Sequence, residues 1–275
     1  MLYPPELRGL GTRLIALAAP SAGGNWHASP PSRAAIQIDM DRKPRPLVLF
    51  DVDGTLLLTA GAGMRAMKRA AGDLFGEAFR WEGIVVAGHL DHLIFAEAAA
   101  LNGLEGFERH HEPFRRRYLE ALAEELERGR DAVRAMPGVH SALERLRSEG
   151  RATLGLLTGN YAEAIPLKFR VVGIDPAWFE VTAFADDAAS RRDLVEVALA
   201  KYARQAGTPI DPRRVVIVGD TPRDVDCAHA HGCFAFAVAT GGYDVDALAR
   251  AGADRVVADL SDPKPLFEAV DRLAY

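Results

Sequence analysis

The sequence predicts an α/β fold in which a doubly wound parallel sheet forms the core and an α-helical cap domain is inserted into it. Three observations lead to this class. Short apolar runs at Leu47–Phe50, Thr153–Leu157 and Val215–Val218 have the length and composition of strands buried on both faces. Segments of helical pattern separate such runs after Pro137, as in a chain that alternates strand and helix. The long stretch between the first two runs is instead helical almost throughout.

Residues 61–136 form that helical stretch and are assigned to the cap. Ile84–Ala87 is the one short apolar segment within it that has a strand-like composition. Thr59–Gly63 and the return near Met136 are the expected hinges between cap and core. Three segments carry apolar residues at helical spacing: Met64–Phe75, Leu90–Leu101 and Phe107–Leu126.

Residues 46–60 and 137–275 are assigned to the core, which is Rossmann-like because helices alternate with its strands. Pro137-Gly138-Val139 opens a helix that runs to about Ser148, and Gly150 fits its C-terminal stop. Pro166 lies inside the next predicted helix and indicates a delayed start or a kink. The later strands are predicted at Thr153–Leu157, Val181–Phe184, Val215–Val218, Phe234–Val238 and Asp254–Ala258, with a helix at Leu194–Ala203.

Residues 1–45 differ from the rest of the chain and are expected to form a poorly ordered N-terminal extension. They contain Pro4-Pro5 and Ser29-Pro30-Pro31-Ser32, which interrupt both helices and strands. The apolar piece Leu14–Ala19 weakly resembles a signal peptide, but Pro20 ends it after few residues.

The composition of the chain argues against several classes of partner. Its 33 Lys and Arg and 38 Asp and Glu give a net charge of −5 with no long basic stripe, so no nucleic acid partner is expected. No apolar run is long enough to span a bilayer, so no membrane association is expected. Cys227 and Cys233 form no disulfide framework and indicate a reducing, cytoplasmic location. His110-His111 and Arg115–Arg117 are expected on solvated helix surfaces.

The first predicted strand ends in two acids. Asp51 and Asp53 lean to the same side because side chains alternate along an extended chain, and Gly54 lets the backbone turn at once. The carboxyl ends of parallel strands are where open α/β sheets bind ligands. Two carboxylates there repel each other unless a cation or a shared proton intervenes. The pair therefore suits a nucleophile, a general acid/base and a divalent metal ion.

Further strand ends supply compatible groups. Thr158-Gly159-Asn160 combines a hydroxyl, an amide and free backbone N–H groups at a helix start, which is typical of phosphate binding. Asp220 follows another strand and Asp224 lies in the next helical turn, and both are candidate oxygen ligands of Mg²⁺. Arg191 and Arg192 precede an apolar helix, where one of them can offset the carboxylates and bind a phosphoryl oxygen.

Taken together, these residues resemble the haloacid dehalogenase superfamily, in particular its phosphatases similar to phosphoglycolate phosphatase. The resemblance covers the chain from about Pro46 to its end. It rests on four motifs: Asp51-Val52-Asp53-Gly54-Thr55, Leu157-Thr158-Gly159-Asn160, Ser190-Arg191-Arg192-Asp193-Leu194, and Gly219-Asp220 with Asp224. The family usually has a lysine in the third motif, and spacing to Leu194 favours Arg191 over Arg192 as its replacement.

The resemblance implies a mechanism and a cofactor. Asp51 would attack phosphorus to give an aspartyl-phosphate, and Asp53 would act as the general acid and base. Mg²⁺ would bind the Asp51 carboxylate, the Asp53 backbone carbonyl and Asp220, with Asp224 joining or orienting that shell. Thr158, Gly159, Asn160 and Arg191 would bind the phosphoryl group. The partner implied is a small phosphorylated metabolite, and the protein would be a monomer or homodimer.

The cap motif Gly88-His89-Leu90-Asp91 resembles the Gly-x-Thr-Asp of phosphoglycolate-type caps, with Leu90 in place of the threonine. His89, Asp91 and Arg80 are the candidate cap contacts to substrate. A phosphotransferase resembling β-phosphoglucomutase remains an alternative because it uses the same acids. A 2-haloacid dehalogenase is a further alternative that Asp53 disfavours, and a receiver-like signalling module would lack the large helical insert.

Overall fold

The structure is a computed structural model that describes residues 45–274. Six strands form one parallel sheet in the order β5-β4-β1-β6-β7-β8, and the predicted fold class is confirmed. The expected N-terminal extension, apart from residue 45, lies outside the described residues. The strands of this sheet are β1 (Leu47–Phe50), β4 (Thr153–Leu157), β5 (Val181–Ala183), β6 (Val215–Gly219), β7 (Phe234–Val238) and β8 (Arg255–Val257).

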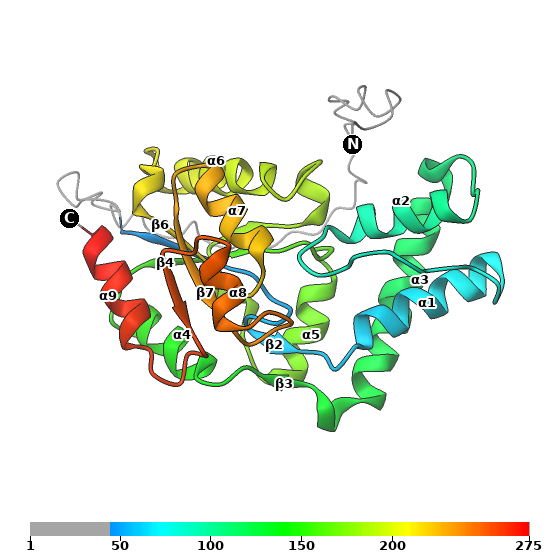
Figure 1. The fold of residues 1–275 in the computed structure, drawn as a ribbon, viewed down its shortest axis with the longest axis horizontal. Helices are drawn as coiled ribbons and strands as arrows, with labels where there is room; N and C mark the ends of the chain where they lie inside the picture. Colours follow the sequence, from blue (N-terminus) through cyan, green and yellow to red (C-terminus); the bar gives the residue numbers. More distant parts are fainter. Residues whose placement is uncertain (1–44, 275) are drawn as a thin grey trace, which may run out of the picture. The chain divides into compact units, whose positions relative to one another are not determined.

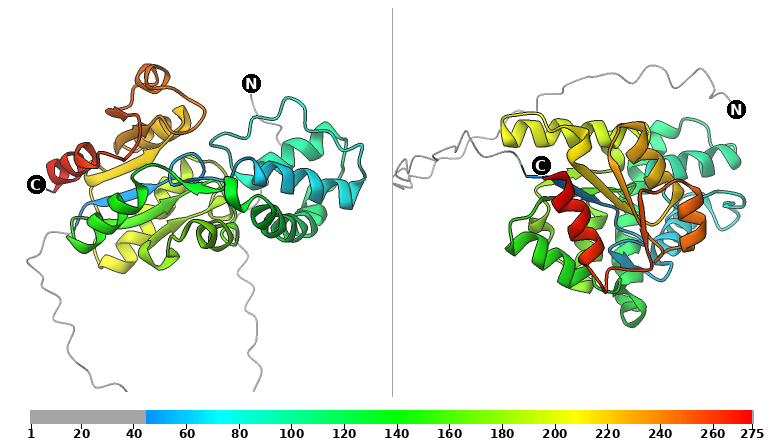
Figure 2. Two further views of the ribbon diagram at one scale, coloured as in Figure 1. Left: turned by 90° about the horizontal axis from the view of Figure 1, so that it is seen from below. Right: turned by 60° about the vertical axis from the view of Figure 1, so that its left-hand side comes forward.

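Helices cover both faces of the sheet (Figures 1 and 2). Alternate residues of β1 divide between the two faces: Leu47 and Leu49 pack with α6 and α7, and Val48 and Phe50 pack with α4, α5 and α9. All four are fully buried, which is why this strand reads as an unbroken apolar run. The core helices are α4 (Val139–Ser148), α5 (Ala164–Val172), α6 (Asp193–Ala206), α7 (Pro222–Ala230), α8 (Val245–Arg250) and α9 (Lys264–Leu273).

Short elements complete the core. Pro166 is the third residue of α5, in the first helical turn, where a missing N–H costs no intrahelical hydrogen bond. The predicted delayed start therefore explains this proline. Within residues 45–274, four 3₁₀ turns join the longer elements: η2 (Arg130–Ala132), η3 (Pro176–Trp178), η4 (Ala185–Asp187) and η5 (Pro212–Arg214). In the part of the chain that the structure describes, no helix combines the length and apolar character needed to cross a bilayer.

The inserted segment consists of α1 (Ala62–Phe75), α2 (Asp91–Leu101) and α3 (Phe107–Arg128), drawn at the right of Figure 1. The chain enters through β2 (Leu57–Leu58) and returns through β3 (Arg134–Ala135), which pair antiparallel. This two-stranded ribbon lies between the sheet and the inserted helices in sequence. The boundaries assigned above to cap and core stay a prediction.

Two expectations for the cap are wrong. Ile84–Ala87 forms a loop and no strand, although it is the most strand-like segment of the insert. His111 is half-buried rather than solvated, because its ring stacks on Phe95 and its Nε2 lies 3.0 Å from the Tyr161 hydroxyl of the core. The error at His111 has a tertiary cause, because its contact with the core leaves no periodic signal in the sequence.

Arg115 also departs from the expected solvated surface. Its Nη2 donates to both carboxylate oxygens of Glu163 at 2.8 and 2.6 Å, and to Asp186 Oδ2 at 2.9 Å. Its guanidinium carbon lies 5.0 Å from the centre of the Tyr161 ring. Because Arg115 is on α3 and its partners belong to the core, this side chain joins cap to core.

Candidate active site

A cavity of about 550 Å³ lies where the carboxyl ends of β1, β4 and β6 face the inserted helices. The core contributes the residues that follow these strands, and the cap contributes residues of α1, α2, α3 and the loop before α2. The cavity therefore occupies the edge of the sheet at which the sequence predicts ligand binding. Its lining includes the predicted site residues Asp51, Asp53, Gly159, Asn160, Arg191, Asp220, His89 and Asp91.

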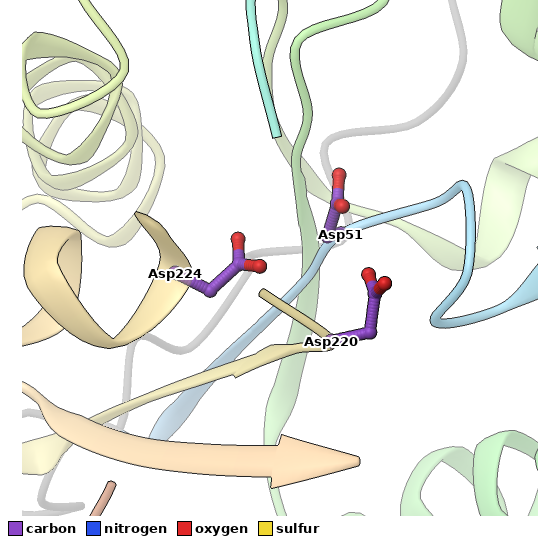
Figure 3. A group of neighbouring side chains, drawn as sticks. All are labelled: Asp51, Asp220 and Asp224. Carbon is purple, nitrogen blue, oxygen red and sulfur yellow. The ribbon is translucent and has the colours of Figure 1, made fainter. Parts of the chain in front are cut away.

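Three acids, shown in Figure 3, gather at the core end of this cavity: Asp51 and Asp220 line it, and Asp224 lies beside them outside the lining. Each offers a carboxylate oxygen, and these oxygens lie within 4.8 Å of one another. The three residues come from the end of β1, the end of β6 and the first turn of α7. Strand pairing explains the first two, because β1 and β6 are neighbours and the residues that follow them emerge side by side.

The backbone around Asp224 fixes its direction. Thr221 is the N-cap of α7, and both its backbone N–H (3.0 Å) and its hydroxyl (2.7 Å) donate to Asp224 Oδ2. Pro222, as predicted, occupies the first turn of this helix. Asp224 is thereby held with its second oxygen toward the acid cluster.

Burial and mutual repulsion disfavour the ionised form of two of these acids. Burial raises the pKa of Asp51 to about 6, and Arg191 only partly opposes that effect. Burial, together with the neighbouring Asp51 and Asp224, raises the pKa of Asp220 to about 8. One arginine does not compensate three buried carboxylates. An all-oxygen donor set with this excess of negative charge fits a hard divalent cation, so the cluster can hold a metal ion.

Two glycines make room for Asp220. A Cβ on Gly54 would lie 2.4 Å from Asp220 Oδ2, and Gly54 also has the positive φ of +83° that disfavours other residues. A Cβ on Gly241 would lie 1.7 Å from the same oxygen. Gly241-Gly242 follow β7 and line the cavity, a role that the sequence did not single out because a glycine pair also marks an ordinary turn.

Arg191 is the cation of the acid cluster. Its Nη2 lies 2.5 Å from Asp224 Oδ1 and 3.2 Å from Asp51 Oδ1, and the side chain is buried. Burial alone would lower the pKa of Arg191, but Asp224 and Asp51 raise it above its ordinary value, so it stays charged. Arg192 points elsewhere and pairs with Asp226 on the surface. Of the two arginines, the geometry therefore brings Arg191 to the cavity.

Asp53 has a separate set of partners. Its Oδ2 accepts hydrogen bonds from Asn160 Nδ2 at 2.9 Å and from Lys168 Nζ at 2.5 Å. Lys168 also donates to Asn160 Oδ1, so lysine, amide and carboxylate form a closed group. Within residues 45–274, no side chain or backbone group forms a hydrogen bond to Asp53 Oδ1. That oxygen remains for a bound molecule.

Lys168 is the functional candidate that the sequence analysis missed. It is only 2% exposed, although lysine is rarely buried without a partner. A signal was present: Lys168 lies four residues after Ala164 and three after Ile165, on the apolar face of α5. A lone lysine on an otherwise buried helical face requires an acceptor, and Asp53 supplies it.

The structure places only part of the predicted phosphate-binding run, Thr158-Gly159-Asn160, in the cavity lining. Gly159 and Asn160 line the cavity, whereas Thr158 is fully buried and is not part of the lining. Among the described residues, the Thr158 hydroxyl has no hydrogen-bond partner. Gly159 is pressed against the cap, because its carbonyl accepts the Asp91 N–H at 2.7 Å and a Cβ would lie 1.9 Å from the His89 carbonyl oxygen.

The three candidate cap contacts, His89, Asp91 and Arg80, also differ in position: the first two line the cavity and Arg80 does not. Asp91 is buried, its Oδ2 accepts the Tyr161 N–H at 3.0 Å, and burial raises its pKa to about 7. His89 Nε2 lies 2.9 Å from Glu97 Oε1. Arg80, the third candidate, is absent from the lining, and its Nη2 donates to the Leu101 carbonyl at the end of α2.

Comparison with known proteins agrees with this geometry. Residues 48–229 match the family model of the haloacid dehalogenase-like hydrolases, so the chain belongs to that family. The phosphoglycolate phosphatase of Synechococcus elongatus is 32% identical over 142 residues, which make up 52% of this chain and 62% of the relative. The chain thus spans less than two thirds of the length of this curated relative.

Solved structures show the same fold. CbbY from Rhodobacter sphaeroides, in complex with phosphate, has a TM-score of 0.61 at 22% identity, covering 79% of this chain and 96% of that one. β-Phosphoglucomutase from Clostridium difficile has a TM-score of 0.60 at 17% identity, covering 84% of this chain and 98% of that one. At such identities the likeness concerns the fold alone.

Proposed function

We propose that this protein is a Mg²⁺-dependent phosphatase that hydrolyses small phosphorylated metabolites through an aspartyl-phosphate intermediate. One observation carries the proposal: Asp51, Asp220 and Asp224 form a buried oxygen cluster with Arg191 against Asp51, while Asp53 faces the same cavity. This arrangement supplies a nucleophile, a metal-binding group, a fixed cation and a proton donor within one site.

Asp51 is the nucleophile. One of its carboxylate oxygens attacks the phosphorus atom of the substrate, and an O–P bond forms as the ester P–O bond breaks. Asp53 donates a proton to the leaving alkoxide through Oδ1, the oxygen that its partners Asn160 and Lys168 leave unengaged. Arg191, 3.2 Å from Asp51 Oδ1, balances the negative charge of the phosphoryl oxygens.

Hydrolysis of the intermediate reverses these roles. Asp53 accepts a proton from a water molecule, which attacks phosphorus and breaks the bond to Asp51. The free Asp51 carboxylate and inorganic phosphate result. Asp51, Asp220 and Asp224 would hold Mg²⁺, which supplies charge neutralisation at the phosphoryl oxygens.

The size of the barrier requires all of these groups. Uncatalysed hydrolysis of a phosphate monoester needs accelerations of up to ~10²¹, whereas a general acid/base contributes roughly 10²–10⁴. The remaining acceleration must come from positioning and charge stabilisation. This is consistent with a cavity in which the charged side chains are held by partners from different elements.

Release of phosphate from p-nitrophenyl phosphate tests this proposal. The wild type is expected to release phosphate with Mg²⁺ and to stop in EDTA. Asp51→Asn should abolish turnover and keep the fold, while Asp226→Asn, which alters an exposed acid outside the cavity, should behave as wild type. Activity of Asp51→Asn at the wild-type level would reject the nucleophile. Isomerisation of a sugar phosphate without net phosphate release would instead favour the phosphomutase alternative.

Location and assembly are part of the same proposal. The two cysteines of the described chain, Cys227 and Cys233, are free and buried, which supports a reducing, cytoplasmic location. We expect a monomer or homodimer. Cell fractionation and light scattering of the purified protein test the two points separately.

A further inference from the structure

The two ends of the cavity differ in chemistry. The core end is lined by acids, by Arg191 and by Lys168. The opposite wall, from β2 and the cap, is apolar over most of its residues: Leu58, Met64, Met67, Val86, Ala87 and Ile94. Val86 remains 41% exposed, so apolar surface extends to the opening of the cavity. A phosphoryl group at the acid cluster would direct the rest of a substrate toward this wall.

Neither cation of the lining is free to bind a second anionic group. Lys168 bonds to Asp53 and Asn160, and Arg191 pairs with Asp51 and Asp224. Both also lie at the core end. Among the residues that the structure describes, the cap contributes no Lys or Arg to the lining.

The remaining polar side chains on or near this wall do not favour binding of an anion. Asp91 lines the cavity and would add negative charge when ionised. The His89 ring is engaged by Glu97. Arg223 lies behind Gly88, where its Cδ would be 3.2 Å from an added Cβ, and it is not part of the lining. A carboxylate on the leaving group would thus be desolvated without a counter-ion.

Tyr118 supplies a neutral hydrogen-bonding group on the apolar wall. The residue is 1% exposed and lines the cavity, and its hydroxyl would lie 3.9 Å from a Cβ on Gly63, another lining residue. The hydrogen bonds found within residues 45–274 do not engage this hydroxyl. Burial raises the pKa of Tyr118, so the group stays protonated and can donate to a neutral oxygen.

We infer that the substrate is a phosphomonoester whose leaving group is uncharged and largely apolar, with at most a neutral oxygen that faces Tyr118. This inference rests on the proposed function and narrows it. It separates the chain from a phosphatase specific for phosphoglycolate, because the leaving group of that substrate carries a carboxylate. The discriminating feature is the cation-free wall formed by α1, α2, α3 and the loop before α2.

A matched pair of substrates tests the inference. The compounds 3-carboxypropyl phosphate and 3-carbamoylpropyl phosphate have the same length, and three methylene groups keep the basicities of their leaving groups similar. The wild-type enzyme with Mg²⁺ is expected to favour the neutral amide in kcat/KM by roughly 10-fold or more. Phosphoglycolate should be a poorer substrate than n-butyl phosphate.

A charge introduced on the wall should reverse this preference. Met64 is only partly buried, so Met64→Lys adds a cation to the cavity with little disturbance, and Met64→Leu is the matched neutral control. Met64→Lys is expected to shift the ratio of kcat/KM values toward the carboxylate by roughly 10-fold. Met64→Leu controls for loss of the methionine side chain and should keep the wild-type ratio, whatever its absolute rates, and Arg223→Met, outside the lining, should match wild type.

The outcomes are distinguishable. A wild-type enzyme that hydrolyses p-nitrophenyl phosphate but prefers the carboxylate, or treats both compounds alike, overturns the inference and leaves the proposed function standing. Absence of Mg²⁺-dependent hydrolysis of every compound, p-nitrophenyl phosphate included, overturns both. If Met64→Lys fails to fold, the wild-type comparison decides the inference by itself.

Discussion

The two ends of the cavity are built in different ways. At the core end, charged side chains from separate elements hold one another: Arg191 contacts Asp51 and Asp224, and Lys168 contacts Asp53. The cap end is lined largely by apolar side chains, and behind this lining the cap helices pack through aromatic rings, of which Phe95 and Phe114 stack with centres 3.8 Å apart. The difference supports the division of tasks that we propose, in which the core performs the phosphoryl chemistry and the cap selects the leaving group.

After Asp51→Asn, which should abolish turnover, the largest effect is expected at Asp53. Asp53→Asn removes the group that protonates the leaving oxygen, so kcat should fall by roughly 10²–10⁴-fold for an alkyl phosphate. The loss should be smaller for p-nitrophenyl phosphate, whose leaving group needs little protonation. Steady-state rates on both substrates measure the contrast. Equal losses on both substrates would argue against proton donation by Asp53.

Lys168 should come next. Lys168→Met leaves Asp53 and Asn160 without their shared donor, and we expect kcat to fall by about 10²-fold with KM little changed. Lys201→Met is the matched control, because Lys201 pairs with Asp187 outside the cavity. Circular dichroism of both variants should show a folded protein. Wild-type kcat in a folded Lys168→Met variant would remove Lys168 from the site.

Smaller effects are expected on the cap wall. Tyr118→Phe removes a neutral hydrogen bond worth about 1 kcal/mol, which corresponds to a fall of roughly 5-fold in kcat/KM. The fall should appear for substrates that carry a neutral oxygen and disappear for n-butyl phosphate. A loss as large as that of Asp53→Asn would mean that the cap takes part in the chemistry, contrary to the division proposed here.

The smallest effect on turnover is expected from substitution of Asp91. That substitution should instead change the pH dependence of the protein's stability. The pKa of Asp91 is about 7 in the folded protein and 3.8 when unfolded, so the folded state holds the extra proton between these values. Stability from this group is present below pH 3.8 and is lost as the pH rises through about 7, by at most roughly 4 kcal/mol.

Asp91→Asn keeps an acceptor for the Tyr161 N–H and removes the titration. Thermal melts of wild type and variant should coincide near about pH 4, and the variant should melt at the higher temperature near about pH 8. A variant that melts lower at both pH values would show that the ionised carboxylate stabilises the fold.

The sequence predicts the core end of the cavity better than the cap end. Asp51, Asp53, Asn160 and Asp220 follow strands, and the carboxyl ends of parallel strands meet at one edge, so their convergence could be predicted from the order of elements. The strand Thr153–Leu157 was predicted with its observed bounds for a related reason, because buried parallel strands read as continuous apolar runs.

Features set by tertiary contact could not be predicted in this way. The ribbon of β2 and β3 has two residues in each strand, too few for any periodic signal. Lys168 reaches Asp53 from a helix face across 115 positions of sequence. Arg80 bonds within the cap and Arg115 bonds to the core, and only the packing of the cap helices decides which of the two arginines turns to the core. The local sequence indicates only the secondary-structure preference of each segment. These contacts form only once the whole fold has assembled.

The central claim is that Asp51, at the core end, takes up the phosphoryl group. The most direct test of this claim is to trap the phosphorylated enzyme. The wild type should be quenched in acid during turnover of p-nitrophenyl phosphate with Mg²⁺, digested and measured by mass spectrometry. We predict one added HPO₃ group on the peptide that contains Asp51, absent in Asp51→Asn and unaffected by Met64→Leu on the cap wall. Steady turnover with the phosphoryl group found on another residue, or on none, would contradict the central claim.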